Sequence, residues 1–70
     1  MDPIPAQVLV NNIHAQGIEA GIHHLRMVES NRGINIDRKE ALYQIILAAQ
    51  EADCSNLAAA AIVIYEGTQN

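Results

Sequence analysis

Aromatic residues and cysteine are scarce in this chain of 70 residues, which has no Phe, no Trp, two Tyr and one Cys. A single thiol excludes an internal disulfide, and no Cys or His residues have the spacing of a zinc site. Ala, Ile, Leu and Val supply most of the apolar half of the sequence and give a thin core per chain. Domains this short often need a disulfide, a structural metal or oligomerisation to be stable. We therefore expect one small domain over residues 1–70 that associates with itself.

Long apolar runs are also missing. The longest, Leu57–Tyr65, has nine residues, whereas a membrane-spanning helix needs about 20. The opening "MDPIPAQ" has an acid and two prolines where a secretory signal has positive charge followed by an apolar segment. With the free thiol of Cys54, these features favour a cytoplasmic protein that does not enter a membrane.

Three helices are predicted, separated by turns near residues 31–36 and 53–56. The first follows Pro5 and covers about residues 6–30, where apolar residues recur every three or four positions. Gly17 and Gly21 interrupt this helix, and each costs about 1 kcal/mol relative to Ala. Either the helix kinks there or another backbone passes close to it, and the sequence leaves both alternatives open.

The second helix is predicted over about 38–53 and the third over about 56–66. Gly33 suits the left-handed turn that ends the first helix. Asp37 is a typical N-cap for the second, with Glu40 as the reciprocal partner of a capping box. The residues "ADCSN" favour caps and turns and so separate the last two helices, although these could also merge.

The segment "AIVIY" near the end of the chain would also suit a strand. The preceding alanines and the lack of a second strand favour a helix, so the predicted fold is an all-α, three-helix domain. The third helix is apolar almost all the way round and therefore needs burial almost all the way round. Two helices of its own chain are expected to cover two of its sides. Leaving a third side of a few hundred Å² exposed would lose several kcal/mol of stabilisation from apolar burial, at about 25 cal/mol per Å². A homo-oligomer, dimer or higher, is thus expected, with these interface residues: Gly17, Gly21, Leu57, Ala61, Ile62, Ile64 and Tyr65.

Charge is unevenly distributed. The formal net charge is −4 and the sequence pI is about 5.0, which argues against binding to nucleic acid. All four basic residues nevertheless fall within residues 26–39, around the first turn. These residues either solvate this turn or form a basic corner, by which we mean a surface that recognises an acidic partner or a small anion. Tyr43, one helical turn further along, would then stack on the bound group. The candidate partner- or anion-binding residues are Arg26, Arg32, Arg38, Lys39 and Tyr43.

Residue types that can act in catalysis or bind metals are present, but their spacing does not indicate a site. His14, His23 and His24 do not form the i, i+4 pair of a metal site. Cys54 lies among acids, which disfavour a reactive thiolate. There is no glycine-rich phosphate loop. We expect no catalytic residues, no metal and no cofactor, and interpret the protein as a non-enzyme.

Two functions follow from these features. The first is a small acidic helical protein that binds a larger protein as an inhibitor, adaptor or assembly factor. Such proteins are common products of phages and other mobile elements, which is a base rate and not a property of these residues. The alternative is an oligomeric small-anion or nucleotide binder that uses the basic corner, with His24 as an added contact.

Overall fold

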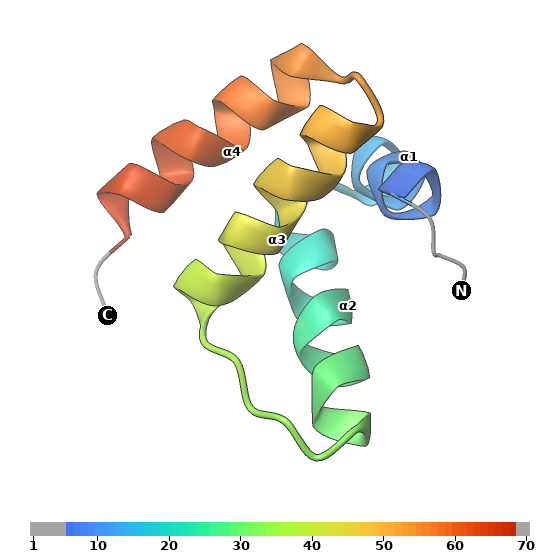
Figure 1. The fold of residues 1–70 in the computed structure, drawn as a ribbon, viewed down its shortest axis with the longest axis vertical. Coiled ribbons are helices and arrows are strands. Elements are labelled where there is room, and N and C mark those ends of the chain that lie inside the picture. Colours follow the sequence, from blue (N-terminus) through green and yellow to red (C-terminus); the bar gives the residue numbers. More distant parts are fainter. Residues whose placement is uncertain (1–5, 69–70) are drawn as a thin grey trace.

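The structure, a computed structural model, describes residues 6–68 and places them in four helices (Figure 1). These are α1 (Ala6–Gln16), α2 (Ile18–Asn31), α3 (Arg38–Glu51) and α4 (Ser55–Gly67). No strand occurs in residues 6–68, and the segment that could have been a strand lies inside α4. The all-α class is therefore confirmed, and the three-helix count is wrong.

The extra helix arises because the first predicted helix is broken at Gly17. This residue has φ 99° and ψ 164°, a conformation that is open almost only to glycine. Its N–H donates to the Ile13 carbonyl at 2.6 Å and closes α1, while its own carbonyl accepts from the Gly21 N–H at 3.3 Å and opens α2. At Gly17, therefore, the kink is the correct alternative.

Gly21 has a different role, because it allows close packing. A Cβ at this position would lie 2.6 Å from Cγ1 of Ile13 and 3.5 Å from Cδ1 of Ile45. The neighbours are side chains of α1 and α3, so the second alternative, a backbone that passes close, is not found at Gly21. The two glycines of one predicted helix thus provide a break and a tight contact.

The turn between α2 and α3 is the best predicted boundary. Gly33, with φ 83°, and Ile34 donate backbone N–H bonds to Ser30 and Glu29 at 2.9 and 2.8 Å, which is a Schellman ending. The Asp37 carboxylate then accepts the Glu40 N–H at 2.8 Å. The predicted N-cap is confirmed, although no return bond from the Glu40 side chain is found within residues 6–68.

The second predicted break is also confirmed, and it moves only slightly, to residues 52–54. Asp53 has φ 60°. The N–H groups of Asp53 and Cys54 donate to the carbonyls of Gln50 and Ala49 at 3.1 and 2.8 Å. This is the same Schellman pattern with an aspartate in the position that glycine usually takes. Helices α3 and α4 are therefore separate.

The core centres on α3, which packs against α1, α2 and α4. Figure 1 shows α3 in the middle of the molecule, with α4 along one side of it. Leu42 and Ile45 are completely enclosed. The other buried apolar residues come from all four helices: Val10, Ile13, Ile22, Ala41, Ile46, Ala49, Leu57, Ala58 and Ala61.

Helix α4 lies at the edge of the fold and packs mainly against α3. Leu57, Ala58 and Ala61 are buried, whereas Val63 is 70% exposed and Ala59 and Ala60 are open to solvent. The expectation that two helices of the same chain would cover two sides of this helix is therefore not met. No helix in residues 6–68 combines the length and apolar character needed to cross a membrane.

Candidate functional site

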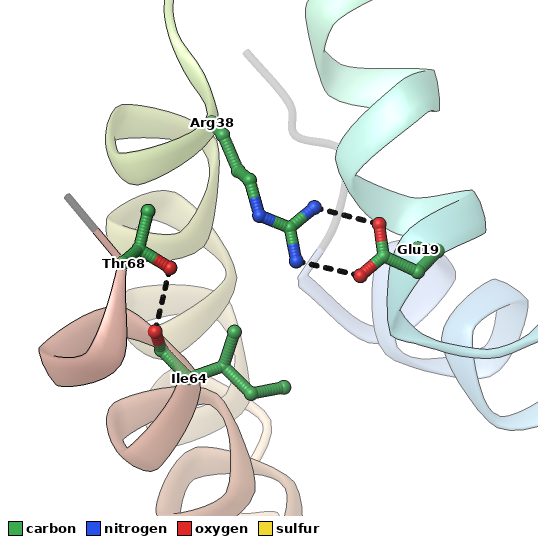
Figure 2. A network of polar contacts seen from close by, with 4 residues as sticks. All are labelled: Glu19, Arg38, Ile64 and Thr68. Atoms are coloured by element: carbon green, nitrogen blue, oxygen red, sulfur yellow. Dashed lines mark hydrogen bonds and ion pairs between the residues drawn. The ribbon is translucent and has the colours of Figure 1, made fainter. Parts of the chain in front are cut away.

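Arg38 of the predicted basic corner is held by a carboxylate of its own chain. Its two terminal nitrogens donate to the two carboxylate oxygens of Glu19 at 2.7 and 2.6 Å (Figure 2). This bidentate hydrogen bond from the guanidinium lowers the pKa of Glu19 below its ordinary value. Arg38 therefore ties the start of α3 to α2.

The other two arginines also have partners within the chain. Nε of Arg26 donates to the Ile36 carbonyl at 3.1 Å, which holds the α2–α3 link against α2. Arg32 lies 3.6 Å from the Glu29 carboxylate, and its side chain remains 66% exposed. The Arg32 side chain is thus more open to an external anion than that of Arg38, which is 40% exposed.

Lys39 and Tyr43 meet the end of α4. Lys39 Nζ lies 4.8 Å from the centre of the Tyr65 ring, a distance suited to a cation–π contact. The rings of Tyr43 and Tyr65 lie 6.3 Å apart at an interplanar angle of 44°, within the range of favourable aromatic pairs. Both predicted residues thus help to pack α3 against α4.

The structure does not gather the basic corner into one site. Arg26 and Arg38 line one open hollow beside α2, together with Glu19. Lys39 and Tyr43 line another hollow toward α4. Arg32 lines neither of them. An anion at either hollow would meet cations that are already hydrogen-bonded, ion-paired or stacked.

The predicted oligomer-interface residues differ in how far their own chain buries them. Gly21, Leu57 and Ala61 are buried, and Gly17 is exposed at the α1–α2 break. The remaining three are half-buried on α4: Ile62, Ile64 and Tyr65. A second copy approaching α4 from outside would meet the more exposed Ala59, Ala60 and Val63 first. Oligomerisation through this helix stays a prediction.

The most apolar hollow of the three described here lies between α1, α2 and α3, and we call it the α1–α3 groove. Its volume is about 620 Å³. Large side chains that line it are open to solvent, among them Val8, Val28, Tyr43 and Leu47, of which Leu47 is 46% exposed. The other lining residues are Ala6, Leu9, Asn12, His24, Leu25, Glu29, Glu40, Gln44, Ala48 and Glu51.

The charges of the groove have one sign. Glu29, Glu40 and Glu51 line it, and no Lys or Arg does. Glu29 is paired with Arg32, whereas neither Glu40 nor Glu51 forms an ion pair within residues 6–68. On α3, one stripe runs from Glu40 through Tyr43 and Leu47 to Glu51, at the i, i+3, i+7, i+11 spacing of one helix face. The stripe is apolar in the middle and acidic at both ends.

The structure also joins two residues that are far apart in the sequence. Sγ of Cys54 lies 3.6 Å from Nε2 of His14. A thiol beside an imidazole can act as a nucleophile with its base when a third group orients the imidazole ring. Within residues 6–68, however, no third side chain orients the ring, and no three His, Cys, Asp or Glu residues are grouped as a metal site would need. The pair packs the α3–α4 turn against α1.

Sequence reasoning missed most of the groove. Tyr43 and Leu47 are four residues apart in the second predicted helix and so share one of its faces, which was the available signal. Val8 and Val28 were expected on one helix over about residues 6–30, and whether it kinks at its glycines was left open. The break at Gly17 instead brings α1 and α2 separately against α3, so the groove depends on a bend that the sequence left open.

Comparison of the chain with protein-family models, with curated proteins and with solved structures gave no match.

Proposed function

We propose that this protein is a non-enzymatic helical binding module that acts by docking a larger protein partner in the α1–α3 groove. The observation that carries the proposal is the group of large apolar side chains that this groove leaves open to solvent, above all Leu47 and Val8. Apolar side chains gathered in a concave surface are typical of interaction sites. Burying them releases about 25 cal/mol per Å² of apolar area.

Binding, and not catalysis, fits the polar groups of the groove. Its three carboxylates are distributed along the rim, with Glu40 and Glu51 at opposite ends of α3. A catalytic site needs a nucleophile, a base and a group that stabilises charge within a few ångströms of one reacting atom. Carboxylates at opposite ends of a helix serve better to orient a partner.

Capture of the partner from an extract of the native host tests this proposal. The full chain carries an affinity tag, and the retained protein is identified by mass spectrometry and then produced pure. We expect Leu47→Glu to abolish binding of the pure partner, because the substitution places a charge in the apolar middle of the groove. Gln50→Glu places the same charge on an exposed part of α3 that does not line the groove, and this matched control should bind as the parent does. Equal binding by both variants would show that the groove is not the docking surface.

Self-association through α4 belongs to the same proposal and has its own test. The exposed Val63 and its alanine neighbours suit a second copy, since this face carries little charge. Light scattering should give a mass above that of one 7.6 kDa chain, and Val63→Glu should reduce it to the monomer. A parent protein that is monomeric and folded at micromolar concentration would contradict self-association and leave the groove proposal intact.

The alternative of a small-anion or nucleotide binder finds no open cluster of cations among residues 6–68. Its test is a thermal melt against a panel of nucleotides, because a ligand that binds only the folded state raises the melting temperature by mass action. We expect no rise for the parent protein. A rise that is lost in the double variant Arg32→Gln, Arg38→Gln would favour the alternative.

A further inference from the structure

We infer that the segment received by the α1–α3 groove is an amphipathic helix with two cationic residues about three turns apart and apolar anchors between them. This inference rests on the proposed function and names the chemistry of the partner. It follows from three properties of the groove, which are its helical walls, its length and the position of its charges.

The walls of the groove favour a helical guest. All three walls are α-helices, whose backbone N–H and C=O groups are already hydrogen-bonded within each helix except at the ends. An extended guest would therefore bury backbone groups without partners, which is costly. A helix satisfies its own backbone and presents only side chains. Insertion of an amphipathic helix into an apolar groove is an established mode of recognition.

The length of the groove sets the length of the contact. On α3 it extends from Glu40 to Glu51, eleven residues apart in the sequence. At 1.5 Å per residue this distance is about 16 Å, or three turns of a helix lying alongside. Tyr43 and Leu47 occupy the turns in between. A guest helix thus meets apolar side chains over its middle turns and a carboxylate near each end.

The charges of the groove select cations. Glu40 and Glu51 are exposed and form no ion pair within residues 6–68, so both are available to a guest. A guest with Arg or Lys at the matching positions gains an ion pair at each end, and an acidic guest meets repulsion there. The spacing of the two carboxylates also fixes how far the helix slides along the groove.

A pair of synthetic peptides tests this inference directly. The first is an amphipathic helix with Leu along one stripe and two Arg residues eleven positions apart at the edge of that stripe. The second has the same composition, with the two Arg residues brought together near the middle. Affinity for the full chain is measured by fluorescence anisotropy at low and at high salt. We expect the first peptide to bind with 1:1 stoichiometry and about tenfold more tightly, the sum of two exposed ion pairs. We expect the difference to shrink at high salt.

Matched variants of the protein locate the site. Glu51→Gln should weaken the first peptide about threefold and leave the second nearly unchanged. Glu66→Gln removes the same charge from the exposed end of α4, and we expect it to change neither affinity. Leu47→Ala should weaken both peptides, and Val63→Ala neither.

Several results would overturn the inference. Equal affinities for the two peptides, or equal effects of Glu51→Gln and Glu66→Gln, would show only general attraction to an acidic protein. A monomer produced by Leu47→Ala from an oligomeric parent would identify a second copy as the occupant of the groove.

The inference and the proposed function can fail separately. If neither peptide binds while the captured partner still depends on Leu47, the proposed function stands and the cationic helix is wrong. If the peptides behave as expected but the captured partner ignores Leu47→Glu, the groove has the inferred chemistry and the proposed function fails.

Discussion

Helices α3 and α4 differ in a way that their compositions do not suggest. Helix α4 carries one charged residue, Glu66, whereas α3 carries four, at 38, 39, 40 and 51. Yet α3 has five buried residues and α4 has three. The more apolar helix is therefore the less buried one.

Position in the fold explains this difference. Helix α3 lies between α1 and α2 on one side and α4 on the other, so most of its surface is covered. Helix α4 has only one main neighbour. The middle of its outer face is formed by Ala59, Ala60 and Val63, which are exposed. A helix at the edge of a fold leaves a whole face open to another molecule, whereas the central α3 leaves open a narrower stripe that includes Tyr43 and Leu47. Apolar content alone does not distinguish the two.

The largest effect that sharpens this comparison is expected at Ile45. Its side chain is fully buried at the centre of α3, so Ile45→Ala leaves a cavity and should lower the free energy of unfolding by about 2–5 kcal/mol. At a dilution where light scattering shows the monomer, Val63→Ala on the exposed face of α4 should stay within about 0.5 kcal/mol of the parent. Urea unfolding followed by circular dichroism measures both. Similar losses for the two variants would mean that α4 is buried in solution.

The next largest effect concerns the break that lets α1 and α2 both cover α3. Gly17→Ala has space for its Cβ but forces alanine into a glycine-only conformation, and we expect a loss of about 1–3 kcal/mol. The sign of the change in the free energy of unfolding tells a broken helix from a continuous one, because in a continuous helix the same substitution would stabilise by about 1 kcal/mol. Gly67→Ala, where φ is not positive and the space is also open, is the control.

A smaller effect separates the starts of the two helices. Asp37 caps α3 through its side chain, while α4 begins at Cys54 without a side-chain cap. Asp37→Ala should cost about 1 kcal/mol, and Asp37→Asn, which preserves the cap, much less. Thermal unfolding of the three proteins gives the order. If the two variants were equally destabilised, the charge of Asp37 and not its hydrogen bond would be responsible.

The smallest effect is expected at the Glu19–Arg38 pair, which is largely exposed. The pKa of Glu19 is lowered in the folded state by the hydrogen bond from Arg38. Stability from this pair is therefore present above the ordinary pKa of 4.5 and is lost as pH falls through the lower folded value. Glu19→Gln should reduce the melting temperature slightly at pH 7 and flatten its fall below pH 4.5. An unchanged acid limb would show that the pair does not persist in solution.

The sequence predicted local structure better than it predicted the surface. Asp37 and Gly33 were identified because a cap and a left-handed turn depend on a few neighbouring residues, and both are found where expected. Gly17 was noticed, but a glycine in a helical pattern is compatible with a kink or a contact. Only the packing of Val10, Ile13 and Ile22 around α3 decides which one forms.

The groove could not be derived from the sequence, because it depends on three helices meeting. Val8 and Leu47 fit the apolar stripes of their helices, and nothing local distinguishes a stripe that is covered from one that is open. The basic corner was visible as a cluster in the sequence. Its residues prove to be dispersed, since Arg38 turns toward Glu19 and Lys39 toward Tyr65, while Arg32 lines neither hollow. Whether these residues bind a partner stays a prediction.

The most direct test of the central claim, that a partner docks in the α1–α3 groove, is an NMR titration of the isotope-labelled full chain with the captured partner protein. Amide resonances should shift most from His24 to Glu29 in α2 and from Tyr43 to Glu51 in α3, where the groove is lined. Shifts concentrated at Ala59–Val63 of α4, or around Arg32 in the turn, would contradict the claim and place the docking surface elsewhere.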